Sequence, residues 1–102
     1  MRYLLFLFLL IFSTAKSEIR LEGTVLNQKN GAPIALVNVY DSNSETGEIT
    51  DGEGRFSIVL KDQETASLFF SHIAFNNYYQ NFDSSQSGLT IKMEETLIQL
   101  DD

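Results

Sequence analysis

Hydrophobic and polar residues alternate along most of the chain after residue 17, with the two-residue period of β-strands. In residues 19–26, for example, Ile19, Leu21 and Val25 lie on one side and Glu22 lies on the other. The same pattern predicts further strands at residues 34–40, 55–61 and 89–93, and we also expect strands at 47–50, 78–82 (after a break at Asn76-Asn77) and 97–100. Residues 67–75 form an apolar, aromatic-rich run bounded by loop residues, which predicts a buried strand. No stretch of useful length shows the period of about 3.6 residues of an amphipathic helix.

Turn residues separate these strands and predict how they are connected. Asp51-Gly52 is typical of a tight two-residue hairpin corner, and Gly54 permits a second left-handed step after it. Gly23 inside the first strand predicts a close approach of a neighbour, or a bulge. Residues 34–40 are apolar on both sides, which predicts a central strand. About seven short strands with such turns predict an all-β fold, an antiparallel Greek-key β-sandwich.

The amino terminus has a different character from the rest of the chain. A positive Arg2, an apolar run over residues 3–12 and small residues at 13–17 are typical of a secretory signal peptide. Cleavage after Ala15 or after Ser17 fits the small-residue pattern, and an uncleaved anchor helix is the alternative. We therefore expect a signal peptide at residues 1–17 and one domain at 18–102, exported to the periplasm, associated with the outer membrane or secreted, without a transmembrane span in the mature chain.

Composition narrows the functional classes. The 102 residues include no cysteine, so the chain has no disulfide framework and no thiolate metal site. A net charge of −7 gives a surface that repels phosphate groups, and no basic patch, Walker loop or dinucleotide fingerprint is present. These features argue against nucleic-acid binding and predict no cofactor.

Two groups of residues contain side chains that could bind a metal or catalyse a reaction, but neither has the sequence motif that such a site requires. Glu48, Asp51 and Glu53 could suggest a calcium loop, yet the alternating oxygen ligands and the distal bidentate glutamate are missing. His72 is the only histidine, and no serine or cysteine nucleophile accompanies it in a recognisable motif. We therefore predict no catalytic residue, no metal site and no enzyme activity.

Aromatic residues near the end of the chain suggest binding. Tyr78, Tyr79 and Phe82 could form a platform for a carbohydrate or a peptide, because aromatic rings offer apolar faces with polar tips. The alternative is that they are half core and half surface on an edge strand. Exposed strand edges could also accept a strand from a partner.

Four segments together resemble a known family. The segments are residues 21–25 (LEGTV), 31–39 (GAPIALVNV), 50–58 (TDGEGRFSI) and 68–75 (LFFSHIAF). They resemble the carboxypeptidase-regulatory-like domain in order and spacing, over nearly all of the chain after the signal peptide. One departure is Ala74, where that family commonly has a glycine. The resemblance implies a seven-stranded sandwich like that of transthyretin (prealbumin).

The same resemblance implies an accessory role. In bacterial envelope proteins such a domain often precedes a larger unit, for example a TonB-dependent outer-membrane receptor, and the family has no shared catalytic residues. We therefore expect a non-catalytic module that contacts an envelope protein or a downstream domain. The chain would be a fragment of a larger protein or a small stand-alone member. The alternative is a small secreted domain that binds carbohydrate or peptide through Tyr78, Tyr79 and Phe82.

Overall fold

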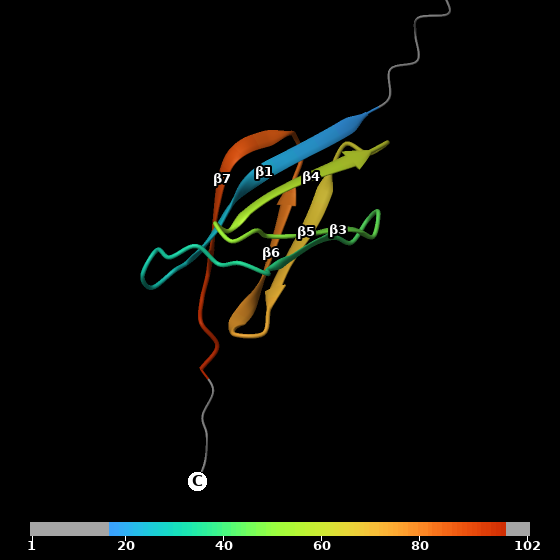
Figure 1. Cartoon of the computed structure of the whole chain (residues 1–102). Coiled ribbons are helices and arrows are strands. Elements are labelled where there is room, and N and C mark those ends of the chain that lie inside the picture. The colour runs from blue at the N-terminus through green and yellow to red at the C-terminus, as the bar shows by residue number, and fades with distance from the viewer. Residues whose placement is uncertain (1–16, 98–102) are drawn as a thin grey trace, which may run out of the picture.

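The computed structural model describes residues 17–97, which form seven β-strands and no helix (Figure 1). The strands are β1 (Glu18–Asn27), β2 (Asn38–Asp41), β3 (Thr46–Ile49), β4 (Arg55–Lys61), β5 (Ala66–His72), β6 (Phe75–Phe82) and β7 (Gln86–Met93). Nothing in this part of the chain has the length and apolar character of a membrane-spanning helix. The expected signal-peptide helix lies outside the described residues.

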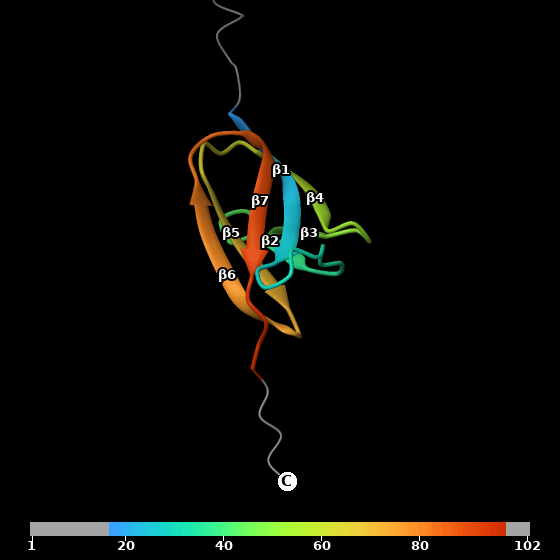
Figure 2. The same ribbon diagram turned by 90° about the vertical axis from the view of Figure 1, so that its left-hand side faces the viewer.

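The strands form two sheets that pack face to face. Sheet A has the order β4-β1-β7, and sheet B has the order β3-β2-β5-β6. Figure 2 shows β1, β4 and β7 in one layer, with β5 and β6 in the other. The chain enters β1 at one end of the sandwich and leaves β7 at the opposite end (Figure 1). The predicted seven-stranded β-sandwich is therefore confirmed.

One pairing departs from the predicted antiparallel arrangement. β1 and β7 are parallel, with Val25 opposite Ile91, whereas the other four pairings between strands are antiparallel. A parallel pair needs a long crossover between its strands, and here the rest of the domain supplies that crossover. Alternation shows only that a segment is a strand, so it could not reveal this direction.

The core lies between the two sheets and contains the inward side of every long strand. Phe70 of sheet B is fully buried, and its ring meets Phe56 of sheet A edge to face at 5.6 Å between centroids. The buried apolar residues are Ile19, Leu21, Val25, Ile34, Val37, Val39, Phe56, Ile58, Leu60, Ala66, Leu68, Phe70, Phe82, Ile91 and Met93. Most of them occupy the apolar positions of the alternating pattern, which explains why that pattern predicted the strands.

The segment around Asp51-Gly52 is a connection between sheets, so the predicted tight hairpin is wrong. β3 pairs with β2 and β4 pairs with β1, so the two strands flanking this segment do not pair with each other. The left-handed residue is Gly54, with φ of 75°. A Cβ at Gly54 would lie 2.7 Å from the carbonyl oxygen of Val25, so its predicted special role has a steric basis.

Gly23 has the predicted close approach. A Cβ there would lie 2.5 Å from the carbonyl oxygen of Leu89, and the register of β1 with β7 shifts at this point.

Two predicted strand boundaries are wrong. Residues 34–37 connect strands, with Leu36 at φ of 62°, and β2 begins at Asn38. Asn76-Asn77 lies inside β6, and the chain turns three residues earlier, at Ile73-Ala74. Leu97 is in no strand, and residues 98–100 lie outside the described part.

Candidate functional site

An aromatic row crosses the outer face of sheet B. Tyr40 of β2 lies opposite Phe69 of β5, which in turn lies opposite Tyr79 of β6. The rings of Phe69 and Tyr79 are 4.7 Å apart between centroids. Tyr79 is 69% exposed and Tyr40 is 36% exposed. We call Tyr40, Phe69 and Tyr79 the aromatic row.

Strand alternation explains why these rings face outward. The neighbours of Phe69 along β5, Leu68 and Phe70, are buried, and so are Val39 and Asp41 on either side of Tyr40. Because successive side chains point to opposite faces, the residues between these buried positions must point away from the core. The aromatic row therefore consists of large rings that the sandwich itself leaves at the surface.

The outward neighbours of the aromatic row on β2, β5 and β6 are polar but uncharged, whereas Glu48 of the edge strand β3 lines the hollow beside the row. Asn38 and Ser71 lie opposite each other on one side of the row, and Ser67 and Asn81 lie opposite each other on the other side. A shallow hollow of about 720 Å³ lies beside Tyr40 and Phe69 and is bounded by Ile49, which is 60% exposed. This region offers apolar ring faces bordered by amides and hydroxyls, a composition suited to contact with a polypeptide or a sugar.

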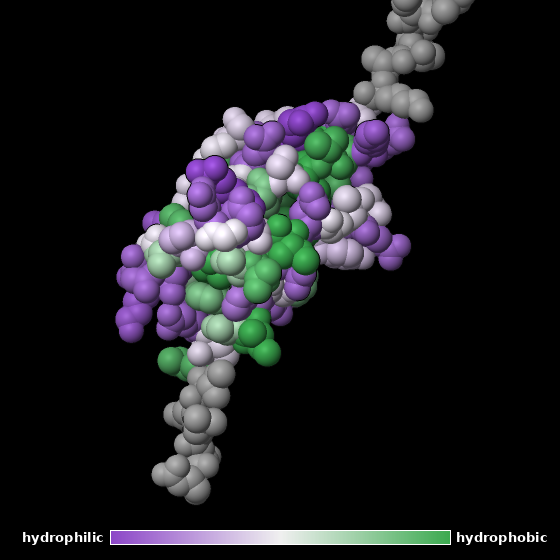
Figure 3. Space-filling model, viewed as in Figure 1, coloured by the Kyte–Doolittle hydropathy of each residue, from purple (hydrophilic) through white to green (hydrophobic). Residues whose placement is uncertain are grey.

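Apolar residues also reach the surface elsewhere in the described part of the chain. Figure 3 shows hydrophobic residues in patches on one face of the molecule, with hydrophilic residues around them. Leu36 at 70% exposed and Ile73 at 95% exposed are examples. These two side chains lie in connecting segments, where single exposed apolar residues are common. Among the exposed large apolar residues of the described part, those of the aromatic row lie opposite one another across several strands.

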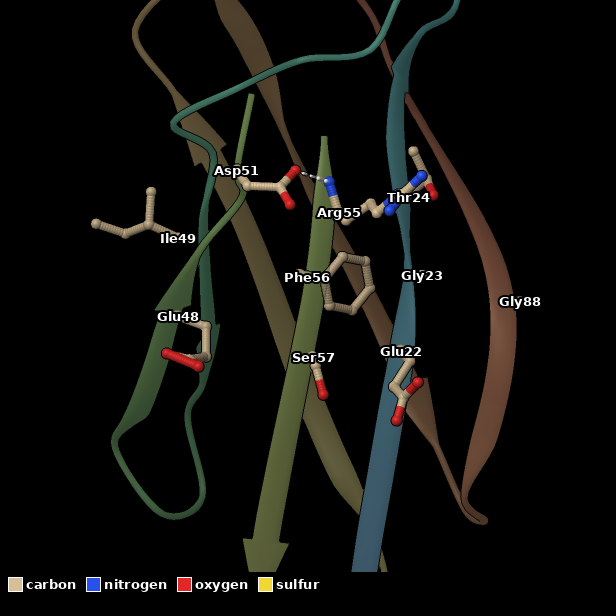
Figure 4. A pocket seen from close by; sticks show the side chains of 10 residues that line it. All are labelled: Glu22, Gly23, Thr24, Glu48, Ile49, Asp51, Arg55, Phe56, Ser57 and Gly88. Atoms are coloured by element: carbon tan, nitrogen blue, oxygen red, sulfur yellow. Dashed lines mark hydrogen bonds between the residues drawn. The ribbon is translucent and has the colours of Figure 1, made fainter. Parts of the chain in front are cut away.

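A second hollow, of about 540 Å³, lies where the edges of the two sheets meet, and it is acidic. Figure 4 shows Glu22 of β1, Glu48 of β3 and Asp51 around it. Oδ1 of Asp51 accepts hydrogen bonds from the backbone N–H groups of Glu53 and Arg55, both at 2.9 Å. The Arg55 N–H lowers the pKa of Asp51 most, and this lowering outweighs the opposing effect of burial.

The charged groups at this turn therefore already have structural partners. The guanidinium of Arg55 pairs with Glu53 at 2.7 Å, on the surface. Within residues 17–97, no group of three histidine, cysteine, aspartate or glutamate side chains is arranged to hold a metal ion. The geometry is that of a turn closed by Asp51, and the absence of a metal in the protein stays a prediction.

Asp41 is a buried carboxylate at the end of β2. Its Oδ2 accepts hydrogen bonds from the N–H and the hydroxyl of Ser44 at 2.9 and 2.7 Å, and from the amide of Gln63 at 3.2 Å. Its Oδ1 accepts one from the N–H of Ser67 at 2.9 Å. Burial raises the pKa of Asp41, but these hydrogen bonds outweigh burial and hold the pKa below its ordinary value. Asp41 ties the loop after β2 to β5, which is a structural role.

His72 stands at the end of β5, half-buried, beside the turn to β6. Its Nδ1 accepts a hydrogen bond from the N–H of Ala74 at 3.0 Å, and its ring meets Phe75 edge to face at 5.3 Å. These contacts close the β5–β6 hairpin.

Tyr78, Tyr79 and Phe82 do not form a platform; they are half core and half surface on the edge strand β6, as the alternative interpretation had it. Tyr79 points outward, whereas Phe82 is 3% exposed in the core and Tyr78 packs against the core beside Phe70. The cause is the same two-residue period that predicted the strand. Tyr40 and Phe69, the true neighbours of Tyr79, were missed because their proximity depends on the pairing of distant strands. The alternation of residues 67–71 was the only signal, and the run had been taken as buried throughout.

Comparison with known proteins gives the family. The family model described as the CarboxypepD_reg-like domain matches residues 21–102. The chain belongs to this family. A TonB-dependent receptor of Formosa agariphila is 31% identical over 99 residues, covering 89% of the chain and 9% of the receptor. The CarboxypepD_reg-like domain thus spans a small part of this curated relative.

A solved structure supports the fold alone. The 3-chlorocatechol 1,2-dioxygenase of Rhodococcus opacus matches with a TM-score of 0.55 and 10% sequence identity, over 83% of the chain and 62% of the dioxygenase. At this identity the likeness shows a shared β-sandwich and carries no activity across. The CarboxypepD_reg-like domain is a regulatory-like module by family, as the resemblance of its four sequence segments had implied.

Proposed function

We propose that this CarboxypepD_reg-like domain is a non-catalytic accessory module of an exported bacterial envelope protein. In this proposal it contacts a protein of the TonB-dependent receptor class, either as part of the same polypeptide or as a separate chain. The similarity to a segment of such a receptor supports this assignment. The signal-peptide pattern of residues 1–17 supports export.

The observation that carries the proposal is the aromatic row. It presents Tyr40, Phe69 and Tyr79 on β2, β5 and β6, whose outward side chains carry no charge, on a chain whose net charge is −7. Burying the outer face of these three strands removes apolar area from water without burying a charged side chain of theirs. Aromatic residues are enriched at the centres of protein interfaces for this reason.

A photo-crosslinking experiment tests this contact. A photoreactive amino acid replaces Tyr40 in the full chain, expressed in an envelope-bearing bacterial host that carries the receptor. The matched control places it at Lys92, which is exposed on the outer side of β7 in sheet A. We expect an adduct with a TonB-dependent receptor, in the outer-membrane fraction, from position 40 and not from position 92. Equal adducts from both positions, or a chain retained in the cytoplasm, would overturn the proposal.

Carbohydrate or peptide binding is the second candidate, and the exposed ring of Tyr79 favours it. In the observed strand arrangement, the rings of Tyr79 and Tyr40 would contact the ligand, with the amides of Asn38 and Asn81 beside them. Titration of glycans and peptides by calorimetry, with Tyr40→Ala as the test variant and Ser57→Ala on sheet A as the control, decides this. Binding that both variants retain, or no binding at all, removes the second candidate.

A further inference from the structure

Sheet B has an open edge, β6, that lacks most of the usual protection against pairing with other strands, since its register against β5 shifts only at its beginning, opposite the segment between Phe70 and His72. The other three edge strands of the sandwich have such protection. In sheet B, β3 has only four residues. In sheet A, β4 carries the charged residues Arg55 and Lys61, and β7 carries Lys92 and the left-handed Gly88. Short length, charge and backbone irregularity all discourage strand addition. β6, on the side of the molecule seen in Figure 2, has eight residues with neither a charge nor a proline.

The hydrogen bonds of β5 show which backbone N–H and C=O groups of β6 point to the open edge. The N–H of Ser67 donates to Oδ1 of Asp41 at 2.9 Å, and its carbonyl accepts from the N–H of Ser42 at 3.1 Å. Ser67 therefore faces β2. Because backbone groups alternate in direction along a strand, Leu68 and Phe70 face β6.

The partners of these two β5 residues on β6 are Gln80 and Tyr78. Both use their backbone groups toward β5. The alternating residues, Tyr79 and Asn81, therefore direct their N–H and C=O groups to the open edge. In the described part of the chain, β6 is the last strand of sheet B, so no further strand takes these groups.

The beginning of β6 is already covered. The N–H of Asn76 donates to the carbonyl of Glu94 at 2.7 Å, and the N–H of Thr96 donates to the carbonyl of Ala74 at 2.9 Å. This contact occupies the edge beside residues 74–76. An added strand is thus limited to residues 77–82, and Tyr79 lies near the centre of this stretch.

The outward side chains of this stretch read the same in both directions: Asn77, Tyr79, Asn81. We propose that β6 pairs antiparallel with β6 of a second copy about a two-fold axis at Tyr79. Each Tyr79 then lies opposite its own counterpart, and each Asn77 lies opposite Asn81 of the second copy. A two-fold interface requires such self-complementarity, and the edge-facing residues exchange backbone hydrogen bonds in pairs.

This arrangement joins the aromatic rows of the two copies into one row across a continuous sheet. It also brings Asp83, just after β6, toward Glu94 of the second copy. Like charges repel less when salt screens them, so we expect the dimer to tighten with ionic strength. The inference does not depend on the proposed function, since that function uses the face of sheet B and dimerisation uses its edge.

Cysteine cross-linking tests the register, because the native chain has no cysteine. In the full chain, Tyr79→Cys places two thiols at a hydrogen-bonded pair with Cα atoms about 5.5 Å apart, within the range that a disulfide spans. Asn81→Cys is the matched control, because its counterpart is Asn77. We expect rapid disulfide dimers from Tyr79→Cys, slow ones from Asn81→Cys, and rapid ones again from the Asn77→Cys/Asn81→Cys double variant.

Sedimentation equilibrium of the full chain, with and without added salt, tests the pairing itself. Asn81→Pro removes an edge-facing N–H and leaves the bonds to β5 intact, a position where an edge strand accepts proline. We expect the dimer to weaken at least tenfold in this variant, with an unchanged circular dichroism spectrum, and to persist in Tyr40→Ser. A full chain that stays monomeric at all concentrations and salt levels overturns the inference. So does Tyr79→Cys that cross-links no faster than Asn81→Cys, or that joins only to other envelope proteins.

Discussion

The outer faces of the two sheets differ in charge although the inner faces share one apolar core. Sheet A presents many charged side chains outward, namely Glu18, Arg20, Glu22, Arg55, Lys61 and Lys92. On β2, β5 and β6 of sheet B, the outward side chains are amides, hydroxyls and the aromatic row. The comparison separates a face suited to water from a face suited to contact.

The physical reason lies in the cost of desolvation. A partner that covered sheet A would have to desolvate several ions, and surface pairs such as Arg20 with Glu18, 3.8 Å apart, give little stability in return. A partner that covered β2, β5 and β6 of sheet B would desolvate only neutral groups, which cost less to bury than ions once they are hydrogen-bonded. If the domain acts as proposed, charge placement favours association through the outer face of sheet B.

The largest effect is expected in the core that both sheets share. Phe70→Ala should lower the free energy of unfolding by about 3–5 kcal/mol, because it leaves a cavity between the sheets. Its neighbour on the outer face, Phe69→Ala, is the matched control and should cost only about 0.5–1.5 kcal/mol, mainly the ring contact with Tyr79. Urea unfolding followed by circular dichroism gives both values. Equal losses would contradict the division into inner and outer faces.

A smaller effect is expected at the buried carboxylate of sheet B. Asp41→Asn replaces an acceptor with an amide whose N–H₂ meets donors, and should cost about 1–3 kcal/mol at neutral pH. The pKa of Asp41 is lowered in the folded state from its ordinary 3.8, so its stabilisation is present above that pH and is lost as the pH falls below it.

Unfolding measured from neutral pH down to acid pH checks this prediction. The difference in stability between the native chain and Asp41→Asn should shrink as the pH falls through the lowered pKa. Because the two proteins share every other ionisable residue, the difference isolates the contribution of Asp41. A difference that stays constant with pH would show that Asp41 is not held ionised by its partners.

Sheet A should be sensitive where β1 and β7 approach each other. Gly23→Ala places a Cβ at 2.5 Å from a backbone oxygen that cannot rotate away, and should cost about 1–3 kcal/mol. Gly52→Ala is the control: a Cβ there meets nothing within 4 Å, so stability should change by less than about 0.5 kcal/mol. Thermal unfolding compares the stability of the two variants. If Gly23→Ala were as stable as the native chain, β7 could move away from β1 without loss of stability.

Local patterns predicted what depends on neighbouring residues along the chain. Alternation located the strands and the core, and Gly23 and Gly54 were singled out because a glycine in or beside a strand needs a reason. The hairpin predicted at Asp51-Gly52 was wrong because a turn sequence does not determine which strands pair on either side of it. The direction of β7 beside β1 was invisible for the same reason.

The candidate site was harder to predict because it is built from strand register. Tyr40 and Phe69 are far apart in sequence, and only the pairing of β2 with β5 places them together. Tyr78 and Tyr79 are adjacent in sequence, yet they face opposite sides of the sheet. A site on a sheet face needs both the alternation and the strand order, and the sequence patterns supplied only the first.

The smallest effect on stability should come from a single charge placed on each outer face. Ser71→Lys on sheet B and Ser57→Lys on sheet A should each change the free energy of unfolding by less than about 0.5 kcal/mol, because both side chains lie on an outer face, away from the core.

The effects of these two variants on association should differ. Ser71 lies beside the aromatic row, so a lysine there would have to be desolvated when a partner covers the row, and the photo-crosslink from position 40 should weaken about tenfold, equivalent to about 1.4 kcal/mol. Ser57 lies opposite Glu22, among charges that stay in water, and its lysine variant should leave the crosslink unchanged. Equal crosslink yields from the two variants would mean that charge placement does not decide which face is covered.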